Sequence, residues 1–434
     1  MKKKVVLMLI VTALMCISII PMFTACSANR EDTLKILTID EYLNEGLIAK
    51  FQDYYKSVTG KDIEVDVQYT PTNEEMYAKI SLSKADFDII CPSDYMVEKM
   101  ARQELLLSLA KDFGTDVDGK EVVDNRKNVS AYLTGDTFSS VPGDYACAYM
   151  WGTLGIVYNR SNISTDTLKS EGWNALWSTS YGKIQMKDSV RDTMAAGAVY
   201  TFKTALDNGA SLNDVINYTD SEHLNQIKTN LITQKKLSSF YGYETDNGKT
   251  DILEGKSSLL LQWSGDAVYT LSDDIKDVVP LDSYPDLAYY VPKYSNVWCD
   301  YWAIPKYAGN TTAANLWINF MCSDKAAIDS MDYIGYTSAI ATDATFEYAN
   351  AAITYAEDDE DEATAAARLI AEDEDRFMYA DISYFFIGVD GAENMLIDYV
   401  QYPPKSVIQY CAVMRDFGDS SQTMQNVWTA VKNA

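Results

Sequence analysis

Apolar and polar positions in the first quarter of the chain switch repeatedly between strand-like and helix-like spacing. An apolar run at 34–39 precedes the stretch 41–57, in which Tyr42, Leu47 and Phe51 fall on one helical face. The same alternation then predicts further elements: strands at 63–69 and 87–91, and helices at 76–82 and 95–103. Repeated strand–helix units of this length predict an α/β fold with a parallel or mixed sheet.

A second run of elements begins near Tyr149. Its pattern predicts strands at 151–158, 183–186 and 258–262, extended segments at 288–291 and 302–304, and helices at 191–206, 221–235, 313–321 and 326–334. Asp188 is the expected N-cap of the helix at 191–206 because a carboxylate there can accept from the first free N–H groups. No internal repeat accompanies these elements.

The first 26 residues are predicted to be a secretory signal peptide. Three lysines, Lys2 to Lys4, precede the apolar run 5–22, and small residues then lead to Cys26. This end resembles a bacterial lipoprotein processing site, at which Cys26 would carry the lipid. The alternative is a retained membrane anchor, although the run is barely long enough to span a bilayer. Both readings place the rest of the chain outside the cytoplasm. The lipoprotein reading predicts a lipid-anchored protein in the periplasm or at the cell surface.

Composition narrows the function classes. The 434 residues, 47% of them apolar, suffice for a large core and more than one domain. Lys and Arg total 36 against 63 Asp and Glu, a net charge of −27, and removal of three signal lysines makes it −27 − 3 = −30. Such a surface repels phosphate, so nucleic acid is not an expected partner. Because His223 is the only histidine, imidazole-based metal sites and catalysis are disfavoured, and we expect no cofactor.

Five cysteines follow Cys26, at positions 91, 147, 299, 322 and 411. Their isolated spacing and apolar neighbours predict buried thiols, with two disulfides at most. The acidic segment 357–375 is expected to form a solvated helix or a disordered insertion. A calcium site is the alternative, but the segment lacks the glycine and the alternation of an EF-hand loop.

Carboxylates stand beside aromatic rings where predicted strands end. Parallel sheets bind ligands at the carboxyl ends of their strands, so the junctions 38–42, 71–75 and 92–95 are the first places to search. Acid–aromatic neighbours occur in four motifs: Asp40-Glu41-Tyr42, Ser93-Asp94-Tyr95, Trp263-Ser264-Gly265-Asp266 and Trp298-Cys299-Asp300-Tyr301-Trp302. Carboxylates suit the charged ends of a cation, and π faces suit both its charge and its methylene groups. Each motif alone also fits ordinary core packing.

Taken in order along the chain, these motifs resemble the extracytoplasmic spermidine/putrescine-binding proteins of bacterial ABC importers. The resemblance covers about 34–340 and 402–431, and further motifs support it: Asn73-Glu74-Glu75-Met76-Tyr77-Ala78-Lys79, Phe87 to Tyr95, Trp151 to Ile156, Asp188 to Asp192, Gln262 to Gly265, Ile334-Gly335-Tyr336 and Arg415 to Gly418. It implies a two-lobed, type II-like periplasmic-binding-protein fold with the ligand between the lobes. Lobe 1 would span 33–150 and 299–346, and lobe 2 would span 151–298 and 347–434, including the acidic insertion.

By that resemblance, the chain is a non-enzymatic, monomeric solute-binding lipoprotein that passes a polyamine to ABC permease subunits. Asp300 would pair with an ammonium, Trp263 and Trp298 would wall the methylene chain, and Glu41 and Asp192 would meet charges nearer the ends. The full set of implied ligand-binding residues is Glu41, Tyr42, Ser93, Tyr95, Asp192, Trp263, Trp298, Asp300 and Tyr336.

Three positions depart from the family pattern: Ile39 replaces a tryptophan, Ser189 replaces a second acid, and Met414 replaces a glutamine. The preferred polyamine therefore stays open between putrescine and longer members. Two other readings also remain. One is a two-lobed protein for another small cation, iron, an anion or a sugar, since this architecture does not fix its cargo. The other is a glycosidase using two carboxylates such as Glu41 and Asp300.

Overall fold

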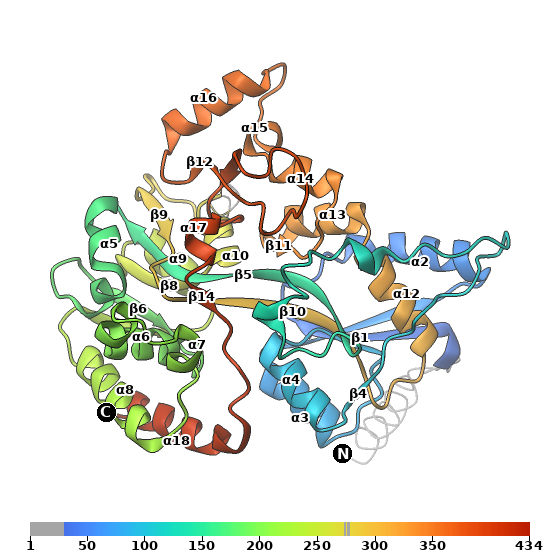
Figure 1. Ribbon diagram of the computed structural model, residues 1–434, viewed down its shortest axis with the longest axis horizontal. Helices are drawn as coiled ribbons and strands as arrows, with labels where there is room; N and C mark the ends of the chain where they lie inside the picture. The colour runs from blue at the N-terminus through green and yellow to red at the C-terminus, as the bar shows by residue number, and fades with distance from the viewer. Residues whose placement is uncertain (1–29, 273–274, 276–277) are drawn as a thin grey trace, which may run out of the picture.

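One curled sheet runs through the whole molecule (Figure 1). The computed structural model describes residues 30–272, 275 and 278–434, so the predicted signal peptide and Cys26 lie outside the described residues. Within those ranges the sheet has twelve strands in the order β2-β1-β3-β10-β5-β8-β6-β7, with β4, β9, β11 and β14 attached beside β5 and β10. The strands are β1 (Thr33–Ile39), β2 (Glu64–Thr70), β3 (Ile89–Ile90), β4 (Leu106–Leu107), β5 (Ala146–Asn159), β6 (Ile184–Lys187), β7 (Phe240–Glu244), β8 (Leu259–Trp263), β9 (Leu287–Tyr290), β10 (Ser295–Pro305), β11 (Thr337–Ser338) and β14 (Cys411–Ala412).

The sheet is parallel toward both ends and antiparallel in the middle. β1 pairs in parallel with β2 and β3, and β6 pairs in parallel with β7 and β8. Between these ends, β10 pairs antiparallel with the first part of β5, while the last part of β5 pairs antiparallel with β8 and β9. Two long strands therefore cross from one half of the molecule to the other, and Figure 1 shows the two resulting lobes.

Helices cover the sheet in each lobe because their apolar faces need a partner surface. The first lobe carries α2 (Gly46–Thr59), α3 (Asn73–Ser81), α4 (Asp94–Arg102), α12 (Thr311–Met321) and α13 (Asp324–Ile334). The second carries α5 (Thr165–Glu171), α6 (Asp192–Asp207), α7 (Leu212–Val215), α8 (Ser221–Lys235), α9 (Gly248–Leu253), α10 (Ser264–Thr270) and α18 (Ser421–Lys432). Short 3-10 turns complete the set at Arg30–Asp32, Asn125–Asn128, Asp136–Phe138, Gly172–Trp177 and Gly418–Ser420. No helix of the described ranges is long and apolar enough to cross a bilayer.

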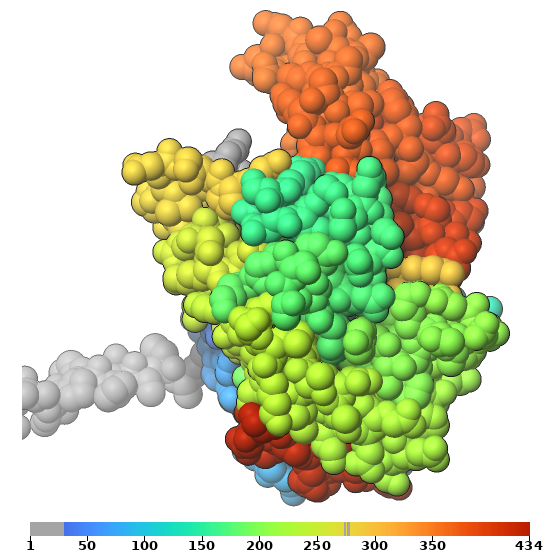
Figure 2. Space-filling model, turned by 90° about the vertical axis from the view of Figure 1, so that its left-hand side faces the viewer, coloured from blue at the N-terminus to red at the C-terminus, as the bar shows by residue number. Residues whose placement is uncertain are grey.

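The acidic segment forms a helix in a protruding C-terminal unit. This unit contains α14 (Asp343–Ala349), α15 (Ala351–Thr354), α16 (Glu362–Glu372), α17 (Lys405–Ile408) and the two-stranded sheet of β12 (Phe377–Ala380) with β13 (Met395–Asp398). Arg368 on α16 pairs with Glu360 at 2.8 Å, which neutralises part of the acidic run. Figure 2 shows this unit standing out at the top of the molecule. Its base is anchored where the Phe385 ring stacks on Trp151 of β5 at 5.1 Å.

Most predicted elements are confirmed to within a few residues, and two local predictions are wrong. The helix expected from Glu41 begins only at Gly46, because Glu41 has a left-handed φ of 58° and the Asn44 side chain accepts from the Gly46 N–H instead. Asp188 is not the N-cap of α6, which is Arg191. The Ser189 hydroxyl accepts from the backbone N–H of Asp192, and Asp188 forms an ion pair with Lys432.

Candidate functional site

Asp300 stands at an irregular point of β10, between the two lobes. The register of β10 against β5 shifts between Asp300 and Tyr301, and an isolated bridge links Asp300 to Ser93 at the start of α4. A shift of this kind re-aims a side chain out of the regular alternation of a strand. The carboxylate of Asp300 therefore meets residues that follow β1 and β3, which places it at the carboxyl ends of the parallel strands.

Hydroxyl groups hold the Asp300 carboxylate. The Tyr42 hydroxyl donates to Asp300 Oδ2 at 2.6 Å, and the Ser93 side chain also bonds to it. Asn73, the first residue of α3, fixes Ser93 by donating to its hydroxyl at 2.9 Å and accepting from its backbone N–H at 3.0 Å. Burial raises the pKa of Asp300 to about 6, although both hydrogen bonds oppose this shift. Asp300 is thus an acid without a salt bridge among the described residues.

Aromatic rings form the wall beside this carboxylate. The Tyr42 ring packs edge-on against Tyr336 at 5.2 Å, and the Tyr336 ring lies 5.5 Å from the ring of Trp298. Two glycines make room for these rings. A Cβ on Gly152 would lie 2.7 Å from Trp298, and a Cβ on Gly265 would lie 2.1 Å from Tyr336. The buried indole N–H of Trp298 has no hydrogen-bond partner within the described residues, so it is a donor free to meet a ligand.

The second lobe contributes Trp263 and Asp192. The Trp263 indole N–H donates to Asp192 Oδ1 at 3.2 Å, and Asp192 forms no salt bridge in the described part of the chain. The negative charges of Asp192, Asp266 and Asp300 all help to raise the pKa of Tyr336 well above its usual value, together with burial, which is the largest cause. Asp266 accepts a hydrogen bond from the Tyr336 hydroxyl, and the charges of Asp300 and Asp192 also act on it, so the surroundings of Tyr336 are negatively charged.

Sequence reasoning missed a charged network behind Trp263. Lys187, the last residue of β6, places its ammonium 4.2 Å from the Trp263 ring centroid and pairs with Glu244 at 3.0 Å. It also lies 3.5 Å from Asp266, which accepts from the Tyr336 hydroxyl at 3.0 Å. Asp266 was visible within the Trp263 motif, but nothing in the local sequence links Lys187 to that ring. A resident ammonium over an aromatic face weakens the attraction of the same ring for a second cation.

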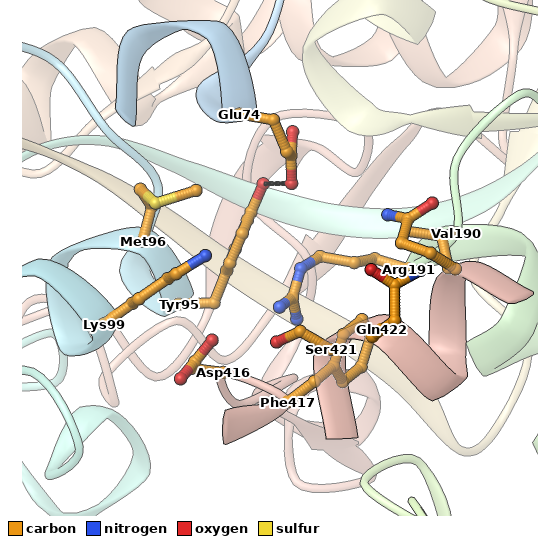
Figure 3. Close-up of a pocket in the computed structure, with 11 residues that line it drawn as sticks. Glu74, Tyr95, Met96, Lys99, Val190, Arg191, Asp416, Phe417, Ser421 and Gln422 are labelled. Carbon is orange, nitrogen blue, oxygen red and sulfur yellow. Dashed lines mark hydrogen bonds between the residues drawn. The ribbon is translucent and has the colours of Figure 1, made fainter. Parts of the chain in front are cut away.

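Tyr95 lies at a neighbouring cavity of about 180 Å³ rather than beside Asp300 (Figure 3). The guanidinium of Arg191 covers its ring at 3.4 Å and the ring of Phe417 at 4.1 Å. The Tyr95 hydroxyl donates to Glu74 at 3.1 Å. The preceding residue, Asp94, accepts from the backbone N–H groups of Tyr95 and Cys299, and burial raises its pKa to about 7. Tyr95 and Asp94 thus have partners within the protein.

Glu41 lies at the exposed rim of the space between the lobes. Its left-handed turn follows β1, and its charge helps to raise the pKa of Lys249, against the opposing effect of burial. Of the nine predicted site residues, the structure brings Tyr42, Ser93, Trp298, Asp300 and Tyr336 into one contact network. The charge of Asp192 acts on Tyr336 in this network, and Trp263 is linked to Asp192 by its hydrogen bond. No group of three or more His, Cys, Asp or Glu in the described ranges is arranged to hold a metal ion.

Comparison with known proteins gives consistent matches. The model of the bacterial extracellular solute-binding protein family matches residues 40–328. The spermidine/putrescine-binding periplasmic protein of Salmonella typhimurium is 26% identical over 318 residues, which cover 72% of this chain and 79% of that protein. The spermidine/putrescine-binding periplasmic protein 1 of Haemophilus influenzae is 28% identical over 324 residues, covering 72% and 77%.

A solved structure shows the same fold. The Tp0655 lipoprotein of Treponema pallidum superposes with a TM-score of 0.65 at 17% identity, covering 93% of this chain and 100% of that chain. At this level of identity the match supports the architecture alone. The α/β fold expected from the sequence, with two lobes joined by crossing strands, is confirmed by this likeness and by the sheet order.

Proposed function

Because the chain belongs to the bacterial extracellular solute-binding proteins, whose family model covers 289 of its 434 residues from 40 to 328, we propose that it captures a polyamine outside the cytoplasm and delivers it to an ABC permease. Two lines support the cargo. The relatives from Salmonella typhimurium and Haemophilus influenzae are spermidine/putrescine-binding proteins. The space between the lobes also offers carboxylates and aromatic rings, which are the groups that an alkyl-ammonium ligand needs.

The observation that carries this proposal is the Asp300 carboxylate. It is held by two hydroxyl groups, faces the rings of Tyr42, Tyr336 and Trp298, and has no cationic partner in the described part of the chain. A carboxylate in such a site is destabilised by burial until a positive charge arrives. An ammonium group beside Asp300 would supply that charge, and the methylene chain that follows it would lie against the aromatic wall.

Asp192 is the proposed partner for the second charged end. It receives one hydrogen bond, from Trp263, and no ion pair within the described residues, whereas Glu244 and Asp266 are already neutralised in part by Lys187. Two carboxylates then remain for the ligand, which favours a diamine such as putrescine over longer polyamines. Glu41, Tyr95 and Ser93 are proposed to act at the edges: Glu41 attracts cations at the rim, Ser93 orients Asp300, and Tyr95 closes the neighbouring cavity.

Capture proceeds by closure of the two lobes about β5 and β10. A ligand that contacts Asp300 from the first lobe and Trp263 and Asp192 from the second stabilises the closed form by its differential affinity for that form. Closure also excludes water, which strengthens each ion pair. Binding at micromolar concentration corresponds to about −8 kcal/mol. The closed protein then docks on the permease.

Calorimetric titration of the purified chain tests the cargo. Putrescine, spermidine and spermine are the ligands, with glucose and Fe³⁺ as controls. We expect one-to-one binding of at least one polyamine in the micromolar range, with putrescine the tightest. No heat from any polyamine, or binding of glucose alone, would reject the proposed cargo while leaving the fold unaffected. Incubation with aryl glycosides tests the enzymatic alternative, for which we expect no turnover.

The membrane attachment is a separate proposal. Cleavage before Cys26 and lipidation of its thiol would anchor a monomer of two lobes, 33–150 with 299–346 and 151–298 with 347–434, on the extracytoplasmic side. The three lysines and the apolar run that precede Cys26 support this. Mass spectrometry of the N-terminal peptide should find a diacylglycerol-modified Cys26, and Cys26→Ala should release the protein from the membrane fraction. An unmodified Cys26 in membrane-bound protein would contradict it.

A further inference from the structure

Two cysteines from distant parts of the chain meet inside the first lobe. Cys147 is the second residue of β5, and Cys322 caps the C-terminal end of α12, 175 residues later. Their Sγ atoms are 3.4 Å apart, and both side chains are buried, with 7% and 1% of their surface exposed. This separation is close to van der Waals contact between thiols, and a disulfide of about 2.05 Å needs only a small approach of the two sulfur atoms.

The other described cysteines have different neighbours. The Cys299 thiol donates to the carbonyl of Asp300, and the Cys411 thiol donates to the carbonyl of Val407. Cys91 is buried in the helix-covered core of the first lobe, which also contains Trp302 and Ile304. Among the described cysteines, Cys147 and Cys322 are therefore the two whose thiols contact each other. The geometry selects one pairing out of the many that five cysteines allow.

We propose that Cys147 and Cys322 form a disulfide in the exported protein, which ties the start of β5 to the end of α12. The location outside the cytoplasm is taken from the proposed function, because disulfides form and persist in oxidising compartments. In the reaction, two S–H bonds break and one S–S bond forms. A partner disulfide accepts the two electrons and two protons and leaves as two thiols.

The surroundings decide when this bond forms and how long it lasts. The hydrogen bond with the neighbouring Cys147 thiol and burial raise the pKa of Cys322 well above its usual value, so little thiolate exists in the folded protein. Exchange is therefore expected during folding, before α12 packs against the sheet at β10 and both thiols are buried. Once formed, the bond resists reduction, because thiols of high pKa are poor leaving groups. A cavity of about 350 Å³ is lined by Cys147 and Arg126, and it gives a small oxidant a route to the pair.

The bond would act on a strand that carries the site. β5 continues from Cys147 through Gly152, over which the Trp298 ring lies, and β10 runs antiparallel beside it. The C-terminal end of α12 is also fixed by Asn128, whose amide donates to the Cys322 carbonyl at 3.1 Å. A crosslink between these two positions closes a loop of 175 residues, and a long loop is where a crosslink removes most entropy from the unfolded chain.

Peptide mapping of the full chain, exported to the periplasm of a Gram-negative host, tests the proposal. The protein is denatured in acid without reductant, alkylated with iodoacetamide, digested and analysed by mass spectrometry. We expect a linked pair of peptides containing Cys147 and Cys322, two hydrogen atoms lighter than the reduced pair, and alkylated Cys91, Cys299 and Cys411. Alkylation of both Cys147 and Cys322, or a different linked pair, would overturn it.

Thermal unfolding gives an independent readout. Wild-type protein that is reduced while unfolded and then refolded should melt lower than the oxidised protein, by on the order of 5–10 °C. The double variant Cys147→Ser/Cys322→Ser should show no effect of reductant, and Cys91→Ser, a buried cysteine outside the pair, should keep the wild-type response. A response to reductant that persists in the double variant would also overturn the proposal. This outcome is independent of the ligand titration. If the protein contains the disulfide but binds no polyamine, the proposed cargo is wrong and the disulfide stands. If the protein binds a polyamine but Cys147 and Cys322 are both free thiols, the disulfide is wrong and the cargo stands.

Discussion

Asp300 combines a negative charge, partial exclusion from water and the absence of a cation among the described residues. Its hydrogen bonds from Tyr42 and Ser93 lower its pKa, but burial outweighs them, and the net result is a pKa of about 6. The ligand-free protein therefore carries an unfavourable charge at neutral pH. Binding of an ammonium relieves this cost, so the same residue that destabilises the empty site contributes to affinity. Lys187 has the opposite character, because Glu244 already neutralises it.

Asp300→Asn separates these two effects. We expect polyamine binding to weaken by about 3 kcal/mol, roughly 100-fold, because the ammonium would lose its charged partner. The ligand-free variant should be more stable than the wild type by about 1 kcal/mol, because the buried charge is gone and the amide oxygen still accepts from Tyr42. Calorimetric titration and thermal unfolding measure the two quantities. Asp40→Asn removes an equal charge from the exposed rim and should change neither; an unchanged dissociation constant for Asp300→Asn would remove Asp300 from the site.

The raised pKa of Asp300 also predicts how binding depends on pH. The dissociation constant should be flat above about pH 7 and should rise about tenfold per unit below about pH 6, because protonation abolishes the charge. Stability has the opposite trend. The folded pKa of about 6 exceeds the usual aspartate value of 3.8, so this contribution to ligand-free stability is complete below about pH 3.8 and is lost as the pH rises through about 6. Titrations from pH 5 to 8 should show the slope in the wild type and a much smaller one in Asp300→Asn.

At the scale of elements, the site depends on where helices begin and on which positions lack a side chain. α4 begins beside Ser93, and α10 begins directly after Trp263 with Ser264 and Gly265. The Tyr336 ring occupies the space that a side chain at Gly265 would fill, and this position brings its hydroxyl to Asp266. The start of α10 in the second lobe thus contacts the Tyr336 ring of the first lobe at the aromatic wall.

Gly265→Ala tests this arrangement. The new Cβ would lie 2.1 Å from the present position of Tyr336, so the ring must move away from Trp298 and Asp266. We expect polyamine binding to weaken by about 1–3 kcal/mol, the usual cost of overpacking, while far-UV circular dichroism stays close to that of the wild type. Gly242→Ala on β7 is the matched control, because its Cβ would point into open space. Equal affinities for the Gly265→Ala and Gly242→Ala proteins would show that the ring position does not matter.

At the scale of the whole molecule, ion pairs between the two lobes stabilise the closed form relative to the open form. Arg415, just before the C-terminal helix α18, pairs with Glu98 of α4 at 2.8 Å, and Arg102 of the same helix pairs with Asp416. Arg191 lies between the rings of Tyr95 and Phe417, which line the same cavity as Asp416. These contacts involve no ligand, so they favour the closed arrangement in the empty protein as well.

Glu98→Gln should shift the ligand-free protein toward the open form. The pair is partly exposed and is worth about 0.5–1 kcal/mol, so polyamine affinity should fall two- to fivefold. Small-angle X-ray scattering should show a larger radius of gyration without ligand and the wild-type radius at saturation. Lys203→Gln breaks the ion pair with Asp207 inside α6, within one lobe, and serves as the control. Identical radii for the Glu98→Gln and Lys203→Gln proteins would argue against a role of this pair in closure.

Local patterning was a good guide to elements whose partners lie nearby in sequence. The helix expected at 221–235 is α8 with those bounds, and the strand expected at 34–39 is β1 with one residue more. Predictions were weaker where long-range pairing sets the boundary. β5 starts at Ala146 and β10 spans Ser295–Pro305, well beyond the segments expected at 151–158 and 302–304, because the first part of β5 pairs with β10 between residues that are far apart in sequence.

The sequence by itself determined the α/β class, the acidic surface, the order of the acid–aromatic motifs and the family, because all of these are encoded in composition and in short-range spacing. Only the tertiary structure decided which charges meet. It placed Lys187 over Trp263, brought Tyr42 to Asp300 across 258 residues and set Cys147 beside Cys322. Such contacts depend on the order of the strands in the sheet and on which side chains are buried together. Neither can be predicted from a short segment of the sequence, because both depend on residues that are far apart in the chain.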